Sequence, residues 1–174
     1  ALWHLLGSGH YLDSTSKRAL WAGYGAFWLG LIAYVRIVRP ARLMREPFQV
    51  VEVRRERGLI RTLVLTRAAA RPLRFSPGQF GWLTLRASPF AMREHPFSIA
   101  SSAAHPERIE LSIKQLGDFT SIIGDVKRGE TAWFDAPYGR FGIDECPDAA
   151  GYVFVAGGIG IAPIMSMLRT LADR

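Results

Sequence analysis

The chain has 174 residues, of which 49% are hydrophobic and 21% charged, so its composition excludes a disordered polypeptide and allows one domain and part of a second. The formal net charge of +7 indicates an anionic partner, which is a nucleic acid, a membrane face or an anionic ligand. The single cysteine, Cys146, excludes an internal disulfide, an iron–sulfur cluster and a thiolate zinc site.

The first predicted element is a helix over residues 19–38, which begins with the uncharged run ALWAGYGAFWLGLIAYV. At ~1.5 Å per residue this helix would be about 30 Å long, the thickness of the hydrocarbon layer of a bilayer. Arg36 lies near one end, where its long side chain would reach the membrane surface. We predict a transmembrane helix; the alternative is a buried helix, which would need a large protein around it.

Basic residues predict the orientation of this helix, because the more basic flank faces the cytoplasm. Four arginines follow the uncharged run and two basic residues precede it: Arg36, Arg39, Arg42 and Arg45 against Lys17 and Arg18. The chain from Pro40 onward is therefore predicted to be cytoplasmic, and residues 1–6 to be the outer end of an earlier transmembrane helix. His4 and His10 would then lie at the outer membrane edge as candidate haem ligands; ordinary hydrogen-bonded or solvated histidines are the alternative.

Residues 48–134 contain six short runs with strand-like alternation, separated by turn signals such as Arg57-Gly58 and Arg128-Gly129. The predicted strands are Phe48–Arg54, Leu59–Thr66, Phe80–Leu85, Pro96–Ala100, Ile109–Lys114 and Thr131–Phe134. This number of short strands predicts a small antiparallel β-barrel.

One predicted strand starts with His95-Pro96-Phe97-Ser98, in which Pro96 lacks an N–H and so fits a first or edge position. Ser98 and its backbone would offer hydrogen bonds to a flat heteroaromatic ring, while His95 and Arg93 would meet a diphosphate. These residue types together indicate a nucleotide-like ligand at one edge of the barrel.

The stretch KQLGDFTSII, residues 114–123, predicts a strand end, a turn and the start of a helix. The hydroxyls of Thr120 and Ser121 and the free N–H groups of a helix start suit a phosphate. The alternative is an ordinary N-cap formed by Asp118 or Thr120.

The last stretch, residues 151–174, predicts a buried strand at Tyr152–Ala156, a glycine turn, and a helix opened by Pro163. Ile164, Met167, Leu168 and Leu171 would form the packed face of that helix. A strand, glycine turn and helix form the first step of a dinucleotide-binding unit, although any βα turn of an α/β protein is the alternative. Because this unit is incomplete at Arg174, and the chain does not begin with Met, we expect a fragment cut at both ends.

Five motifs, HPFSIASS, FSPGQF, LGDFTSII, APYGRF and VAGGIGIAPIMSML, together resemble the ferredoxin–NADP reductase superfamily. His-Pro-Phe-Ser in place of Arg-x-Tyr-Ser, and the apolar helix that ends in RIVRP, are similar to its membrane branch, the ferric reductases and NADPH oxidases. The resemblance implies a membrane helix, a six-stranded antiparallel β-barrel that binds FAD, and the start of a Rossmann-like α/β domain that binds NADPH. The corresponding segments are 1–45, 46–147 and 148–174.

The resemblance also implies site residues. FAD would be bound by His95, Pro96, Phe97, Ser98, Lys114, Gly117, Asp118, Phe119, Thr120 and Ser121. Ser98 would be the catalytic residue, next to the reactive ring nitrogen. NAD(P)H would contact Pro137, Tyr138, Gly139, Gly158, Ile159, Gly160 and Pro163, although Ala136 replaces the usual glycine before Pro137. His4 matches an outer haem histidine, and His10 is a second candidate.

The implied function is a transmembrane oxidoreductase that passes electrons from NADPH or NADH through FAD and haem b to ferric iron or oxygen. Its flavin domain would be cytoplasmic, beneath a bacterial-type inner or plasma membrane. One alternative is a membrane-anchored, haem-free flavin reductase that serves a separate protein acceptor, and another is a non-catalytic binding module. A nucleic-acid partner is not expected, because the aromatic residues gather in the membrane segment and do not alternate with the basic ones.

Overall fold

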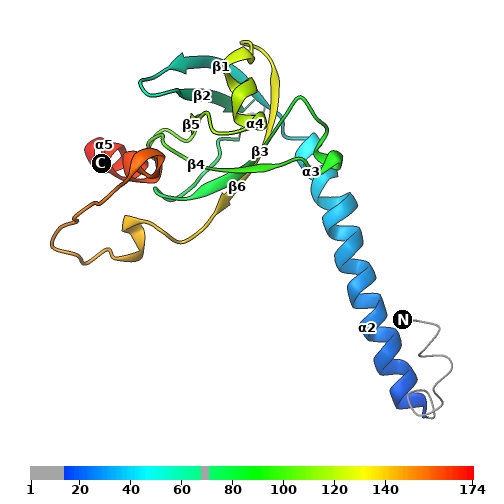
Figure 1. Ribbon diagram of the computed structural model, residues 1–174. Helices are drawn as coiled ribbons and strands as arrows, with labels where there is room; N and C mark the ends of the chain where they lie inside the picture. The colour runs from blue at the N-terminus through cyan, green and yellow to red at the C-terminus, as the bar shows by residue number, and fades with distance from the viewer. Residues whose placement is uncertain (1–13, 68–70) are drawn as a thin grey trace. The chain divides into compact units, whose positions relative to one another are not determined.

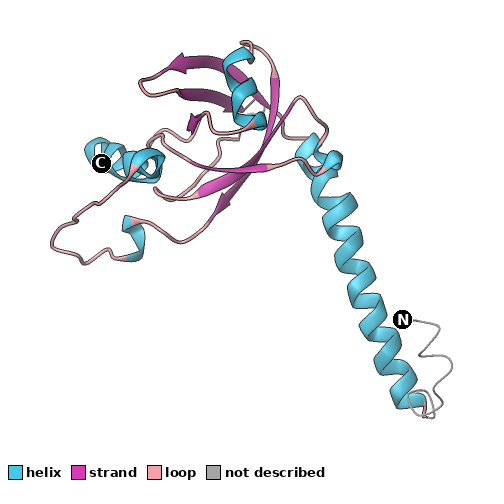
Figure 2. Cartoon of the chain, viewed as in Figure 1, coloured by secondary structure: helices cyan, strands magenta, loops and turns pink. Residues whose placement is uncertain are grey.

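The computed structural model describes residues 14–67 and 71–174, and the chain divides into two compact units, Ala1–Ala41 and Arg42–Arg174. Figure 1 labels the helices and strands, and Figure 2 shows the helical and sheet parts of the chain.

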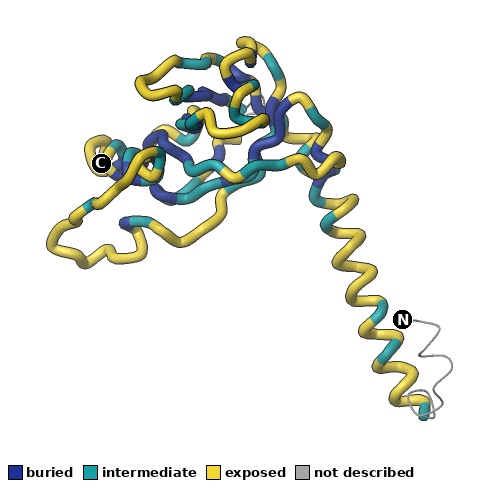
Figure 3. Tube along the Cα trace, in the orientation of Figure 1, coloured by how far each residue is buried: buried dark blue, intermediate teal, exposed yellow. Residues whose placement is uncertain are grey.

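The first unit contains the long helix α2 (Thr15–Ala33) and a π-helical turn (Tyr34–Val38), and the helix continues as α3 (Arg39–Met44), which begins in this unit and ends in the second. Ser14 caps its start, because the Ser14 hydroxyl accepts a hydrogen bond from the Lys17 backbone N–H at 3.3 Å. The continuous helical stretch Thr15–Met44 has a mean hydropathy of 1.3 in its most apolar part, none of which is buried (Figure 3). The predicted helix is confirmed and is longer than expected. Length and composition allow it to cross a membrane, and the crossing itself stays a prediction.

The second unit contains one six-stranded antiparallel sheet in the order β4-β3-β6-β1-β2-β5. All six predicted strands are present, as β1 (Phe48–Arg55), β2 (Ile60–Arg67), β3 (Phe80–Leu85), β4 (His95–Ser98), β5 (Arg108–Lys114) and β6 (Thr131–Tyr138). Observed ends differ from the predicted ones mainly at β4 and β6.

The prediction of a closed barrel is wrong, because β4 and β5 are the two edges of an open sheet. Across the described residues, one isolated bridge between Ile99 and Leu111 joins the chain beyond β4 to β5. Strand β4 is only four residues long and contains Pro96, which cannot donate a backbone hydrogen bond to a second neighbour.

The sheet is curved around an apolar core, which is dark blue in Figure 3. Phe48 of β1 and Phe134 of β6 meet edge-to-face there, with ring centroids 6.2 Å apart. Leu63 and Leu65 of β2 and Leu111 of β5 are fully or almost fully buried beside them. Burial of these large side chains supplies most of the stability of this unit.

The chain beyond β6 departs from the prediction. No regular strand forms at residues 151–157, where Val153 is 94% exposed and Val155 is 88% exposed. A strand needs a hydrogen-bonded neighbour, and no described strand pairs with this segment, so the predicted strand Tyr152–Ala156 is wrong.

The predicted C-terminal helix is confirmed as α5 (Ile161–Asp173), which follows a 3₁₀ turn at Gly158–Gly160. Its packed face differs from the prediction, since Leu168 and Leu171 are 43% and 41% exposed. The buried residues are Ala162, Ile164, Ser166, Met167 and Thr170. Ser166 and Thr170 belong to the packed face because the chain after β4 offers them hydrogen-bond partners. These partners are the Ser101 carbonyl, which accepts from Ser166, and the Ala103 N–H, which donates to Thr170.

Candidate nucleotide-binding site

A cavity of about 320 Å³ lies where β4, β5 and the start of α5 meet. Eight predicted site residues line it: Pro96, Phe97, Ser98, Lys114, Thr120, Ile159, Gly160 and Pro163. Four lining residues were not predicted: Ser112, Ile113, Leu116 and Ala162. Residues predicted for FAD and residues predicted for NAD(P)H therefore contribute to one cavity.

The two segments predicted to bind FAD lie against each other. The His95 ring stacks on the Phe119 ring with centroids 3.8 Å apart and an interplanar angle of 21°. Phe97 lies over the same Phe119 ring, with centroids 6.0 Å apart. Side chains alternate along a strand, so His95 and Phe97 share one face of β4 while Pro96 and Ser98 share the other. Phe119 thus joins the turn after β5 to one face of β4, a contact that sequence reasoning could not foresee.

The turn before Phe119 starts the short helix α4 (Asp118–Ser121), and Gly117 occupies the N-cap position. The Thr120 hydroxyl accepts hydrogen bonds from the backbone N–H groups of Leu116 (2.8 Å) and Gly117 (2.9 Å). The Ser121 hydroxyl donates to the Asp118 carbonyl at 2.7 Å. The hydroxyls expected to meet a phosphate are thus engaged with the local backbone. Because Gly117 is the N-cap, the alternative of an N-cap formed by Asp118 or Thr120 is wrong; Thr120, at the third helical position, instead bonds back to the Gly117 N–H.

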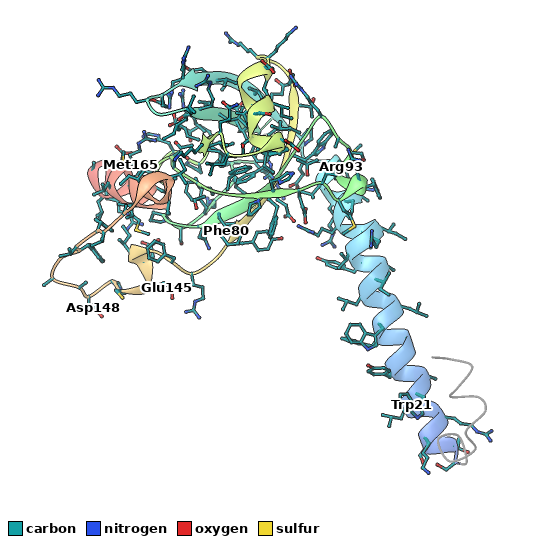
Figure 4. All side chains as sticks on the ribbon, in the orientation of Figure 1. Trp21, Phe80, Arg93, Glu145, Asp148 and Met165 are labelled. Atoms are coloured by element: carbon teal, nitrogen blue, oxygen red, sulfur yellow. The ribbon has the colours of Figure 1, made fainter. Side chains whose placement is uncertain are left out.

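Register across three strands places Ser98, Phe80 and Tyr138 in one row. Phe80 of β3 pairs with Ser98 of β4 on one side and with Tyr138 of β6 on the other. The Phe80 and Tyr138 rings are 6.0 Å apart, and the Tyr138 hydroxyl donates to the Asp135 carboxylate at 2.9 Å. Directly opposite residues of antiparallel strands have their side chains on the same face. The predicted flavin residue Ser98 and the predicted nicotinamide residue Tyr138 therefore flank Phe80, which is labelled on β3 in Figure 4.

A second side chain missed by sequence reasoning is Gln79, in the motif FSPGQF. Its amide nitrogen donates to the Gly139 carbonyl at 2.9 Å, and its amide oxygen accepts from the Ser76 backbone N–H at 2.8 Å. Gly139 has a φ of +91°, a conformation that side-chain-bearing residues rarely adopt. Gln79 thus fixes the turn that follows Tyr138. The proline-glycine pair before Gln79 is a turn signal that could have indicated this role.

The electrostatics of the cavity favour an anion. Among the described residues that line the cavity, Lys114 carries the charged side chain, and the other polar side chains carry hydroxyl groups. The Ser112 hydroxyl lies 3.2 Å from that of Thr62, so it is partly engaged within the sheet. A single ammonium group beside an aromatic ring and small residues suits a ligand with both a flat ring and a phosphate.

Several predicted residues lie outside this cavity. Pro137, Tyr138 and Gly139 are at the end of β6, and Gly158 is in the turn before the cavity-lining Ile159 and Gly160. His4 and His10 lie outside the described residues. Within residues 14–67 and 71–174, no group of three or more His, Cys, Asp or Glu side chains has the arrangement of a metal site.

An antiparallel sheet whose edge strand meets a glycine turn and helix, with a ring-sized and anion-favouring cavity between them, defines a nucleotide-binding flavoprotein domain. Residues 45–131, half of the chain, match the family of FAD-binding domains, and the chain belongs to that family. It is an FAD-binding domain of the ferredoxin–NADP reductase superfamily.

Curated relatives are components of electron-transfer systems. The chain is 35% identical over 126 residues to the probable dihydroorotate dehydrogenase B (NAD(+)), electron transfer subunit, of Methanopyrus kandleri, which covers 72% of this chain and 44% of that protein. It is 32% identical over 102 residues to the reductase component of propane 2-monooxygenase from Rhodococcus jostii, covering 57% of this chain and 26% of that protein. The chain thus spans less than half the length of these relatives.

Solved structures support the fold. The chain resembles phthalate dioxygenase reductase with a TM-score of 0.65 and 24% identity, over 77% of this chain and 41% of that one. It resembles full-length CYP116B46 from Tepidiphilus thermophilus with a TM-score of 0.61 and 30% identity, over 73% of this chain and 17% of that one. Membership of the superfamily is confirmed, whereas the finer likeness to ferric reductases and NADPH oxidases stays a prediction.

Proposed function

We propose that the protein is a membrane-anchored flavin reductase, which takes electrons from NADH or NADPH and passes them to a separate protein acceptor. The observation that carries this proposal is the shared cavity, to which Ser98 and Lys114 contribute from the sheet and Gly160 and Pro163 from the glycine turn and helix. Two ligands that exchange a hydride must meet ring to ring, and residues for both converge here.

The residues around the cavity suit FAD. The Phe97 ring offers a flat apolar surface, the Ser98 hydroxyl a hydrogen bond at a ring edge, and the Lys114 ammonium group a partner for phosphate. Stacking of His95 on Phe119 holds the two cofactor-binding segments together. When bound, FAD supplies the ability to accept a hydride and release electrons one at a time. Residues 46–147 are proposed as the FAD-binding domain.

The nucleotide side of the site would be formed by the turn that contains Ile159 and Gly160, with Gly158 before it and Pro163 after it. Tyr138, with Pro137 and Gly139, lies beside Ser98 through the shared neighbour Phe80. These groups would guide the nicotinamide ring toward the flavin and exclude water from the contact. Residues 148–174 are proposed as the start of the NAD(P)H-binding domain.

The helical stretch Thr15–Met44 is proposed as the membrane anchor. Its most apolar part has no buried residue, and the stretch is long enough to cross a bilayer. Arginines follow the apolar part, at positions 36, 39, 42 and 45, so the flavin domain is proposed to face the cytoplasm of a bacterial-type inner or plasma membrane.

A protein acceptor is favoured over the predicted haem relay to ferric iron or oxygen. The relatives named above are an electron transfer subunit and a reductase component, and neither name includes a haem. His4 and His10, on which the haem prediction depends, lie outside the described residues, so the structure does not test it. On the names of these relatives, the protein is proposed to be haem-free.

Absorption spectroscopy of the full-length protein in detergent tests this proposal. We expect a flavin spectrum that is bleached by NADH or NADPH under anaerobic conditions, with no Soret band. A reducible Soret band would contradict the haem-free proposal and favour the transmembrane relay. A protein that stays colourless after FAD is supplied would instead indicate the non-catalytic binding module.

A further inference from the structure

Buried polar residues are concentrated at one place in the second unit. Seven polar or charged residues are buried in the part of the chain that the structure describes, and five of them lie where α5 packs against the end of β4 and the middle of β5. We call this group the α5 junction; its residues are Ser101, Ser102, Glu110, Ser166 and Thr170. Figure 1 shows α5 beside β4 and β5.

Three direct hydrogen bonds join α5 to the chain segment that continues from β4. The Ser166 hydroxyl donates to the Ser101 carbonyl at 2.7 Å, and the Ala103 backbone N–H donates to the Thr170 hydroxyl at 2.8 Å. The Arg169 guanidinium donates to the Ala100 carbonyl at 2.8 Å. Ser166 and Thr170 are one helical turn apart, so the contacts fix both the position and the rotation of α5.

Glu110 of β5 completes the junction. Its carboxylate accepts hydrogen bonds from Arg169 of α5 at 2.9 Å and from Arg54 of β1 at 2.7 Å. Its backbone N–H donates to the Ser101 hydroxyl at 3.2 Å, and its carbonyl accepts from the Ala100 N–H at 2.8 Å. The Glu110 side chain is only 9% exposed, so its charge depends on these arginines.

Such a junction is better suited to fixing geometry than to adding stability. Buried ion pairs gain little over apolar packing of the same volume, because both charges lose their water. Hydrogen bonds are directional, however, and a buried donor or acceptor left without its partner is costly. A helix held by several of them cannot slide or rotate as it could on a purely apolar surface.

The junction lies close to the cavity along the chain. Ser98 is two residues before Ala100, Lys114 is four residues after Glu110, and Pro163 is three residues before Ser166. The junction therefore joins three of the chain segments that line the cavity, those that contain Ser98, Lys114 and Pro163. Any shift of α5 at the junction moves Gly160 and Pro163 relative to Ser98 and Lys114.

From this arrangement we infer that Arg169 and Glu110 are positioning residues, which set the distance between the nucleotide-binding turn and the flavin-binding strands. The inference rests on the proposed function, since it concerns hydride transfer between the two ligands. Neither side chain lines the cavity, so both act through the elements that they join.

Arg54 provides a matched control. Like Arg169, it donates to the Glu110 carboxylate, but it comes from β1 and makes no contact with α5 among the hydrogen bonds described. Arg54→Gln therefore removes a hydrogen bond to the Glu110 carboxylate and leaves the contacts of α5 in place. Arg169→Gln removes the hydrogen bonds from α5 to the Glu110 carboxylate and to the Ala100 carbonyl. Arg169→Lys is a conservative rescue, because one nitrogen, Nη1, makes both contacts of Arg169, and an ammonium group can make the same two.

The experiment is anaerobic stopped-flow reduction of the bound flavin in the full-length protein, with FAD affinity measured in parallel. With saturating NADH or NADPH, we expect Arg169→Gln to slow flavin reduction by about 10- to 100-fold at unchanged FAD affinity. Arg54→Gln should change the rate by no more than about two-fold, and Arg169→Lys should recover most of it.

Equal rates in Arg169→Gln and Arg54→Gln would overturn the inference while leaving the proposed function intact. A wild-type flavin that neither nucleotide reduces would overturn both. If Arg169→Gln does not fold, Glu110→Gln takes its place, because it removes the charge that Arg169 of α5 contacts while keeping the shape of the side chain. A wild-type rate of flavin reduction in a folded Glu110→Gln protein would then overturn the inference.

Discussion

The charge of Glu110 is expected to contribute measurably to stability, and Glu110→Gln removes that charge while keeping the shape of the side chain. The carboxylate accepts three charge-assisted hydrogen bonds, from Arg54, Arg169 and Arg108 at 2.7, 2.9 and 3.1 Å. Each is stronger than its neutral counterpart by about 1 kcal/mol. The Arg108 and Arg169 side chains are 45% and 40% exposed, so water screens about half of each of their contributions. The Arg54 contact and these two weakened contacts together give about 2 kcal/mol at pH 7.

The pH dependence of this effect has a defined sign. Burial alone would raise the pKa of Glu110, but the hydrogen bond and charge of Arg54, followed by the charge of Arg169 and the bond from Arg108, lower it below its ordinary value of 4.5. The stabilisation is therefore complete above the unfolded-state pKa and is lost as the pH falls through the lower folded-state pKa. Below that range a protonated Glu110 resembles glutamine, so wild type and variant should converge.

Thermal unfolding of the full-length protein in detergent, followed by tryptophan fluorescence, measures the difference. At pH 7 we expect Glu110→Gln to melt roughly 4–8 °C below wild type. As the pH falls below 4.5, the ordinary pKa of this carboxyl, the difference between the two melting temperatures should shrink, because wild-type Glu110 loses its charge as the pH approaches its lowered folded-state pKa. A difference that persists unchanged at acid pH, or no difference at pH 7, would refute the reasoning.

Three further outcomes are expected. Changing His95 and Ser98 together to Ala should weaken FAD retention by at least about ten-fold, measured by flavin release on dilution; unchanged affinity would count against the site. Gly78→Ala should destabilise the fold by about 3 kcal/mol or more in thermal unfolding. The reasons are that Gly78 has a φ of +101° and that the new Cβ would lie 2.0 Å from the Phe141 carbonyl oxygen; a wild-type melting temperature would contradict this packing. Leu29→Arg should lower membrane insertion by about 3 kcal/mol and release protein on carbonate extraction, whereas unchanged retention would argue against an anchor.

The strands could be predicted because their signal is local. Alternation at a period of two is visible in β1, where Phe48 and Val50 are buried and Gln49 between them is exposed. Both ends of β3 were predicted correctly, since a proline-glycine turn precedes Phe80 and polar turn residues follow Leu85. Closure of the sheet could not be predicted, because it depends on whether two strands distant in sequence pair along their whole length.

The errors near the C-terminus have related causes. Tyr152–Ala156 has the composition of a buried strand, but composition does not specify the partner that a strand requires. In α5, apolar periodicity predicted the burial of Ile164 and Met167 correctly, but Ser166 and Thr170 are buried in place of Leu168 and Leu171. Small hydroxyl residues become a packed face only when the opposing surface offers hydrogen-bonding groups, and that surface is unknown until the chain is folded.

The candidate site was predictable in part because some of its signals, like those of the strands, are local in the sequence. Motifs identified Ser98, Lys114 and the glycine turn, because such residues have recognisable chemistry within a short stretch. The stacking of Phe119 on His95 and the position of Phe80 between two predicted residues both depend on strand register. Register is set by the whole sheet, so no short motif encodes it.

The incomplete ladder between β4 and β5 has a chemical consequence of its own. A fully closed barrel would engage the backbone amides and carbonyls along both edges, as the Ile99–Leu111 bridge does locally. Where that ladder stops, main-chain polar groups on either side of the gap keep unused hydrogen-bonding capacity. Ser98 and Lys114 stand at the ends of these two strands and face a common space. A planar heterocycle inserted there would take the place of the missing strand pairing, so that the prosthetic group itself completes the architecture.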